Sequence, residues 1–288
     1  MTTPAVITAP DEVRAVLADP AFVVPPVPND GSPGGIVWLR STVSRFSANG
    51  DHERRRSLVV DELADVDPAA LGQRAFEQTT VLLKSGYEPI DVIAKIARVV
   101  PVELLAEALS LPAGMSEDVN TVAAAYHPRG DFSATADQAV ARLVKACGGI
   151  ADEPTAARIG LLVQACDATA GLVGNALIAA KQQKPTTSVS VILTETLRLN
   201  PPVRATRRQA TADTRVGNFA IVAGEVVTLE LAGSLTFGDG PRKCPGSEHA
   251  FAIAGGVVEA LRGRQLVHDD VEYEPSANLR VPASLTVR

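Results

Sequence analysis

Apolar residues recur at three- and four-residue steps over much of the chain, which is the spacing of one face of an α-helix. The longest uninterrupted pattern of this kind spans residues 155–181. Further helices are predicted at 10–19, 51–63, 71–84, 91–109, 188–200 and 250–261. Short runs rich in β-branched residues predict strands at 215–219, 220–222 and 226–231. The pattern therefore predicts a mainly α-helical fold with a minor β component.

Two stretches lack a long apolar face. Residues 29–35 are dominated by glycine, proline and other turn formers, and we expect a mobile loop there. Residues 110–136 are expected to be irregular. The 288 residues, 46% of them hydrophobic, can bury one large core or two small ones. Because no internal repeat or low-complexity segment divides the chain, we expect a single domain over 1–288.

Composition narrows the classes of function. A net charge of −6 and an isoelectric point near 5.3 imply no surface for nucleic acid or for an anionic membrane. No apolar run approaches the roughly 20 residues that span a bilayer, and the first residues do not resemble a signal peptide. The three cysteines form no CxxC pair, which argues against structural zinc and a disulfide scaffold. We expect a cytoplasmic protein.

The strongest chemical signal is the ten-residue stretch Phe-Gly-Asp-Gly-Pro-Arg-Lys-Cys-Pro-Gly at 237–246. Its glycines allow a sharp turn and a close approach to a flat ligand. Cys244 precedes an apolar helical stretch, and Pro245 suits the first position of a helix. A helix N-terminus stabilises a thiolate, and a lone thiolate can ligate one face of a haem iron. The alternative is a glycine-rich turn that contains an incidental cysteine.

This stretch resembles, position by position, the Phe-Gly-x-Gly-x-(His/Arg)-x-Cys-x-Gly signature of the cytochrome P-450 superfamily. The resemblance implies haem b (iron protoporphyrin IX) as cofactor and Cys244 as the metal ligand on its proximal side. It also implies cofactor contacts from Phe237, Gly238 and Gly246. The expected fold is a compact, pruned version of the cytochrome P-450 fold.

The family's propionate-binding residues also find counterparts. His52 and Arg56 match a His-x-x-x-Arg pattern, Arg208 matches a downstream arginine, and Arg242 lies in the signature itself. Taken alone, His52 and Arg56 could equally form a solvated basic face. The resemblance implies that all four bind the haem propionates, and arginine is the side chain best suited to carboxylates.

A Glu-x-x-Arg pattern at Glu195 and Arg198 puts opposite charges three residues apart on one helix. Such pairs are common on protein surfaces. Together with Pro201, Pro202 and the cysteine signature, the pattern resembles the family's Glu-x-x-Arg helix. The resemblance implies a buried structural ion pair that supports the haem-binding core and takes no part in catalysis.

The long helical stretch resembles the family's oxygen-binding helix, in which an acidic residue precedes a threonine. Thr169 matches the threonine that steers protons, which makes it the candidate catalytic residue. Ala168 stands where the acid is expected, and Asp167 is shifted by one position. One position turns a side chain about 100° around a helix, so Asp167 is not a simple replacement. The alternative is a buried helix that contains an incidental threonine.

Two segments are shorter than the resemblance implies. Arg198 and Cys244 are only 46 positions apart, so an arginine-bearing meander is largely missing before residue 235. Residues 111–149 are too few for the two long helices that usually roof the substrate pocket. We therefore expect an open distal face that a second copy or a dedicated partner covers, with 29–35 contributing at the mouth.

The resemblance implies a haem-thiolate oxidoreductase that acts on a small organic substrate in specialised metabolism. It would work as a monooxygenase supplied by a ferredoxin or flavoprotein, or with peroxide. One alternative is a haem-thiolate protein that does not activate dioxygen and instead performs redox-neutral chemistry or binds haem or a gas. A second is a degenerate, non-catalytic partner of another enzyme.

Overall fold

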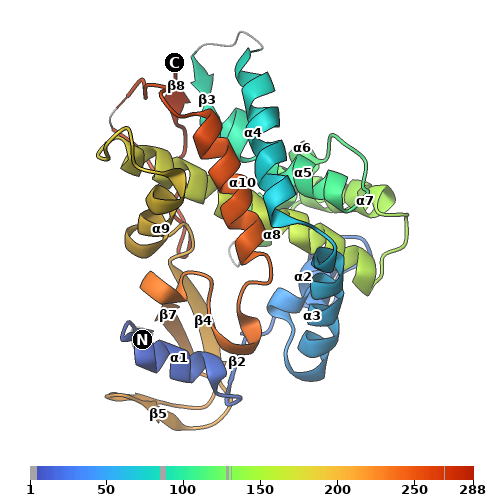
Figure 1. Cartoon of the computed structure of the whole chain (residues 1–288). Helices are drawn as coiled ribbons and strands as arrows, with labels where there is room; N and C mark the ends of the chain where they lie inside the picture. The colour runs from blue at the N-terminus through green and yellow to red at the C-terminus, as the bar shows by residue number, and fades with distance from the viewer. Residues whose placement is uncertain (1–4, 85–88, 128–129, 131, 269) are drawn as a thin grey trace.

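A single long helix organises the molecule. The computed structural model describes residues 5–84, 89–127, 130, 132–268 and 270–288. The long helix, α8, spans Glu153–Ala180, and most of its residues are buried. Its start is fixed by Asp152, whose side chain accepts a hydrogen bond from the backbone N–H of Thr155 at 2.9 Å. Helices α3, α5, α6, α9 and α10 pack against it, as Figure 1 shows. The predicted helix at 155–181 is thus present and central.

Among the remaining helices, α2, α6 and α7 were not predicted, and the others overlap predicted stretches. Their bounds are α1 Pro10–Ala18, α2 Ile36–Thr42, α3 Asn49–Ala64, α4 Pro68–Lys84, α5 Val100–Ala108, α6 Ser116–Tyr126, α7 Ala134–Ala146, α9 Val189–Leu199 and α10 Ser247–Ala260. Short 3₁₀ turns lie at η1 Ser44–Phe46, η3 Gly233–Leu235 and η4 Gly240–Arg242. The prediction of a mainly helical fold is confirmed.

Two helix predictions need correction. The stretch 91–109 is not one helix, because β3 (Ile90–Asp91) is followed by a π-helical turn, η2 (Ile93–Ala97), and then by α5, with Pro101 in its first turn. Proline fits a helix start better than a helix interior. The prediction that 110–136 is irregular is also wrong. It contains α6 and the start of α7, and residues 128, 129 and 131 lie outside the described residues.

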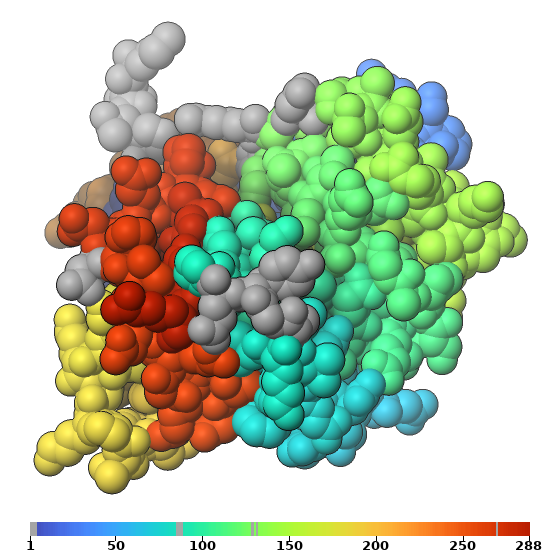
Figure 2. Space-filling view, turned by 90° about the horizontal axis from the view of Figure 1, so that it is seen from above, coloured from blue at the N-terminus to red at the C-terminus, as the bar shows by residue number. Residues whose placement is uncertain are grey.

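Helices α4 and α10 pack along one another on the outer side of α8, where the teal and orange-red segments adjoin in Figure 2. Their backbones approach closely at two glycines. A Cβ on Gly256 would lie 2.1 Å from the carbonyl oxygen of Gly72. No side chain fits at this position, so the close crossing of the two helices depends on Gly256.

The β component lies mainly to one side of the helices (Figure 1). Within the described residues a four-stranded sheet has the order β1-β7-β4-β2, formed by Val6–Ile7, Val226–Glu230, Ala205–Ala210 and Phe22–Val23. Strands β5 (Thr214–Val216) and β6 (Phe219–Ile221) form a hairpin, and β3 pairs with β8 (Thr286–Val287). Strand β4 had no sequence prediction, and it carries Arg208 opposite Val227.

The buried apolar residues form two clusters. The larger joins the helices around α8, and the smaller joins α1 to the four-stranded sheet. Helix α8 is also the one described helix that is long and apolar enough to cross a membrane by length and composition. Because 72% of its most apolar window is buried inside the protein, it has the character of a core helix.

Candidate functional site

A cavity of about 1430 Å³ lies between the helices and the sheet. Strand β4, helices α3 and α8, and the cysteine loop all contribute to its wall. A pocket for a single small molecule occupies roughly 300–1,000 Å³, so this cavity can hold more than one. Every residue predicted to bind the cofactor or to take part in catalysis lines it, namely His52, Arg56, Thr169, Arg208, Phe237, Gly238, Arg242, Cys244 and Gly246.

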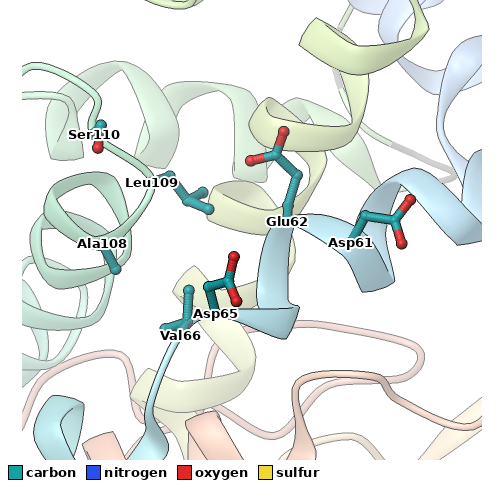
Figure 3. Close-up of a pocket in the computed structure, with 7 residues that line it drawn as sticks. All are labelled: Asp61, Glu62, Asp65, Val66, Ala108, Leu109 and Ser110. Carbon is teal, nitrogen blue, oxygen red and sulfur yellow. The ribbon is translucent and has the colours of Figure 1, made fainter.

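A second, smaller hollow of about 340 Å³ lies between the end of α3 and the residues that follow α5 (Figure 3). Its acidic lining residues are Asp61, Glu62 and Asp65. Glu62 already accepts a hydrogen bond from Arg158 at 2.7 Å. None of the residues predicted from the sequence lies there, so the larger cavity is the candidate site.

The cysteine loop is held in place by its own backbone. The N–H of Cys244 donates to the carbonyl of Phe237 at 2.8 Å, which closes the loop. Gly238 and Gly240 adopt positive φ values of 72° and 63°, a region that favours glycine. Asp239 accepts a hydrogen bond from the N–H of Gly240 at 2.8 Å. The glycines of the sequence motif are thus required by the turn that presents the thiol.

The thiol of Cys244 is exposed within the cavity, although protein surrounds it on most sides. This partial loss of water raises its pKa, and the Gly246 N–H and the nearby Arg56 oppose the shift without cancelling it. The expectation that Cys244 lies at a helix N-terminus needs correction. Helix α10 begins only at Ser247, so the helix terminus lies beyond Pro245 and not at the cysteine.

Three arginines and one histidine gather beside the thiol without a carboxylate partner among the described residues. Arg242 donates to the Ser47 carbonyl at 2.6 Å, and Arg56 donates to the Lys243 carbonyl. Arg208, only 5% exposed, donates to Thr206 Oγ1 and to the backbone of Arg207. The fourth member is His52, which is also buried.

The absence of a counter-charge is reflected in the pKa values of the cluster. The pKa of His52 is lowered to about 4. Burial is the largest cause, and the charges of Arg242, Arg56 and Arg208 add to it. Burial, followed by Arg242 and Arg45, lowers the pKa of Arg208 to about 10. Buried charges are normally paired, but these arginines instead repel one another and disfavour the protonated form of His52. The donor set therefore fits a ligand with two carboxylates, such as the two propionates of a haem.

The hydroxyl of Thr169 faces this cavity from α8. The residue is 1% exposed, and its Oγ1 has no hydrogen-bond partner. A threonine within a helix commonly donates to the carbonyl of the preceding turn, as Thr196 does to Ile192 at 2.7 Å. Because Thr169 makes no such bond, its buried hydroxyl is left unsatisfied in the wall of the cavity.

Asp167 belongs to an ion-pair network that the sequence did not indicate. Arg98 donates to Asp167 at 2.9 Å and to Glu274 at 2.6 Å, and His127 Nε2 lies 3.6 Å from Asp167. Burial would raise the pKa of Asp167, but His127 and Arg98 lower it overall. These partners are far apart in the sequence, and no local pattern links them.

Comparison with solved structures decides the architecture. The chain superimposes on P-450 BioI, in a structure of that protein in complex with an acyl carrier protein ligated with hexadec-9Z-enoic acid. The TM-score is 0.81 and the sequence identity is 19%, over 96% of this chain and 90% of that one. The chain has the cytochrome P-450 fold. CalO2 gives a TM-score of 0.79 and 20% identity over 98% and 89% of the two chains. The tirandamycin C-bound P-450 monooxygenase TamI has a TM-score of 0.75 and 22% sequence identity, over 98% of this chain and 89% of that one. No protein-family model and no curated protein matches the chain by sequence.

On this cytochrome P-450 scaffold the Glu195–Arg198 pair departs from expectation. The two side chains bond to each other at 2.7 Å, but Glu195 is 41% and Arg198 55% exposed. The predicted buried pair is therefore an exposed one. The physical reason is the short connection between α9 and the cysteine loop, in which β4 to β7 and the turn η3 leave no segment to cover this face.

The roof of the cavity also differs from the sequence-based picture. Two short helices, α6 and α7, occupy 116–126 and 134–146, and α6 contributes Asn120 and Ala124 to the lining. Residues 24–28, which include three prolines, line the cavity as well. The loop 29–35, expected at the mouth, contributes no lining residue.

Proposed function

We propose that the chain is a haem-thiolate oxidoreductase of the cytochrome P-450 type that oxidises a small organic molecule. One observation carries the proposal. A single cavity combines an accessible cysteine thiol with buried cations that lack a counter-ion. No simpler ligand accounts for both features, since a bound organic anion alone gives the loop of Cys244 no role.

The roles of the residues follow from their positions. Cys244 would hold the metal as its thiolate, and Arg56, Arg208, Arg242 and His52 would bind the propionates. When bound, the haem supplies the oxidising chemistry, because a thiolate ligand pushes electron density onto the iron and favours O–O cleavage. The unsatisfied Oγ1 of Thr169 would hold and pass a proton from its position on α8.

The rest of the lining supports a substrate with an apolar body. Leu105, Leu161, Ala165 and Leu172 give one wall an apolar surface. An apolar pocket with few polar groups is typical of sites for small organic ligands. A ferredoxin, a flavoprotein or peroxide would supply the reaction, because the chain has no second cofactor motif.

The test is the absorption spectrum of the reduced protein with carbon monoxide. We expect one haem per chain and the long-wavelength Soret band of a thiolate complex. Cys244→Ala should lose this band, whereas Cys147→Ala, the matched control outside the cavity, should keep it. An unchanged thiolate band in Cys244→Ala, or no haem uptake by the unmodified protein, would refute the proposal.

A second function is favoured by the residue that precedes Thr169. Ala168 provides no acid, and Asp167 is held by Arg98 and His127. A haem-thiolate protein with this helix would use peroxide, perform redox-neutral chemistry, or bind haem or a gas without activating dioxygen. Turnover with oxygen and a reductase, compared with turnover with peroxide, separates the two functions.

A further inference from the structure

Arg40 is a buried cation to which the haem-thiolate proposal assigns no role. It lies on α2, lines the cavity and is only 4% exposed. Its Nε has no hydrogen-bond partner, and the guanidinium makes no ion pair with any described residue. Burial lowers its pKa. An unpaired buried guanidinium is costly, so a free one in a cavity wall indicates a missing anion.

Aromatic rings hold Arg40 in place without satisfying its donors. The guanidinium carbon lies 5.0 Å from the centre of the Phe46 ring and 4.8 Å from that of Phe132. Arg45 lies over the same Phe46 ring and over Tyr126, at 5.6 and 6.0 Å. Ring faces attract a cation but leave the N–H groups at its edge free. Those groups are therefore preorganised for a ligand.

Arg40 is carried by a different element from the cations beside the thiol, and Arg45 acts electrostatically on both Arg40 and Arg208. Arg56 and Arg242 bond to backbone carbonyls around the cysteine loop and the start of α3. Helix α2, which carries Arg40, instead packs on α6, α7 and α8. Arg45 on η1 and Arg207 on β4 line the cavity too and act on Arg40 electrostatically. Neither has a carboxylate partner among the residues described.

The carboxylates in the cavity wall are already engaged. Asp167 and Glu274 both pair with Arg98, and Asp239 lies 3.5 Å from Arg14. Six arginines face the cavity without a carboxylate partner in the described part of the chain, Arg40, Arg45, Arg56, Arg207, Arg208 and Arg242. Two haem propionates would balance only two of them.

We propose that Arg40, with Arg45 and Arg207, binds the anionic oxygen head group of the substrate, a carboxylate or a phosphate. The planar fork of a fixed guanidinium suits such a group. The apolar wall formed by Leu161 and Ala165 would take the organic remainder. This inference rests on the proposed function and adds the substrate class, an organic anion with an apolar body.

The experiment measures binding to the haem-loaded protein by titration calorimetry. The probes are decanoate, decyl phosphate and the neutral decanamide, which share one apolar tail. We expect an anion to bind more tightly than the amide. Arg40→Gln should weaken the preferred anion roughly 10- to 100-fold and leave the amide unchanged, because a charge-assisted hydrogen bond is lost. Whichever anion is preferred identifies the head group.

Arg204→Gln is the matched control, since Arg204 is an exposed arginine just before β4 and does not line the cavity. It should bind all three probes as the unmodified protein does. If Arg40→Gln does not fold, Arg207→Gln replaces it with the same expected direction, because Arg207 is an exposed residue of β4 that also lines the cavity. Arg40→Lys should recover part of the anion affinity.

Two outcomes would overturn the inference while the haem-thiolate function stands. One is an unchanged ratio of anion to amide affinity in Arg40→Gln protein that retains the thiolate–carbon monoxide band. The other is loss of haem from Arg40→Gln to the same extent as from Arg242→Gln, which would make Arg40 a propionate partner. Haem content is therefore measured for every variant.

Discussion

Arg98 bonds to Asp167 at 2.9 Å across 69 positions of sequence, from the π-helical end before α5 to the middle of α8. Both side chains are largely buried, at 20% and 15% exposed, and Glu274 completes the pairing of Arg98. This pair fixes the carboxylate of Asp167, a near neighbour of Thr169 in the sequence, as an ion-pair partner. It is therefore poorly placed to serve as a mobile acid.

The first prediction concerns the position before Thr169. Ala168→Asp should raise oxygen-dependent turnover, because it supplies a carboxyl group beside the free threonine hydroxyl. General acid–base groups contribute roughly 10²–10⁴-fold in rate. Turnover with a reductase and oxygen measures the effect, and peroxide-driven turnover serves as the internal control. An equal change in both assays would argue against proton delivery as the missing element.

The second prediction is a pH dependence from His52. Its pKa is about 4 in the folded protein, against an ordinary value of 6.5. Between these values the unfolded chain binds the additional proton, so the free energy of unfolding of the haem-free protein should fall as the pH drops from 6.5 to 4. The loss is up to about 3 kcal/mol.

Chemical denaturation across this pH range checks the prediction. His52→Gln should lack this part of the pH dependence, whereas the exposed His268→Gln should keep it. Identical pH profiles for the two variants would contradict the assignment.

The third prediction concerns the contact between α4 and α10. Gly256→Ala should destabilise the fold by about 1–3 kcal/mol or more, because its Cβ would meet the Gly72 carbonyl oxygen at 2.1 Å. Gly255→Ala is the control, with its nearest neighbour, Leu193, at 3.7 Å. Alanine is the better helix former, so this change should be neutral or stabilising. Denaturation midpoints of the two variants should therefore move apart.

The fourth prediction tests the exposed Glu195–Arg198 pair. Because both side chains are solvated, Glu195→Ala or Arg198→Ala should lower the free energy of unfolding by less than about 1 kcal/mol. Haem content and the carbon monoxide spectrum should be unchanged. A variant that folds but no longer takes up haem would show that this pair supports the core despite its exposure.

Local patterns in the sequence were sufficient for the framework and for the cysteine loop. The apolar spacing at 155–181 predicted α8, and the glycines around Cys244 predicted a turn that presents its thiol. Both features depend on contacts between residues a few positions apart. Strand β4, in contrast, was missed, because its alternation is interrupted by Arg207 and Arg208.

The tertiary structure alone decided which charges are paired. The sequence contains many arginines, and nothing in their local setting distinguishes the buried, unpaired Arg40 from the exposed Arg204. The Glu195–Arg198 pattern likewise carried no information about burial, and the structure leaves it on the surface. Burial and ion pairing depend on segments that meet only in the fold. The sequence could therefore indicate the cysteine ligand, but the cation-lined cavity required the packing of α2, α3, α8 and β4 around it.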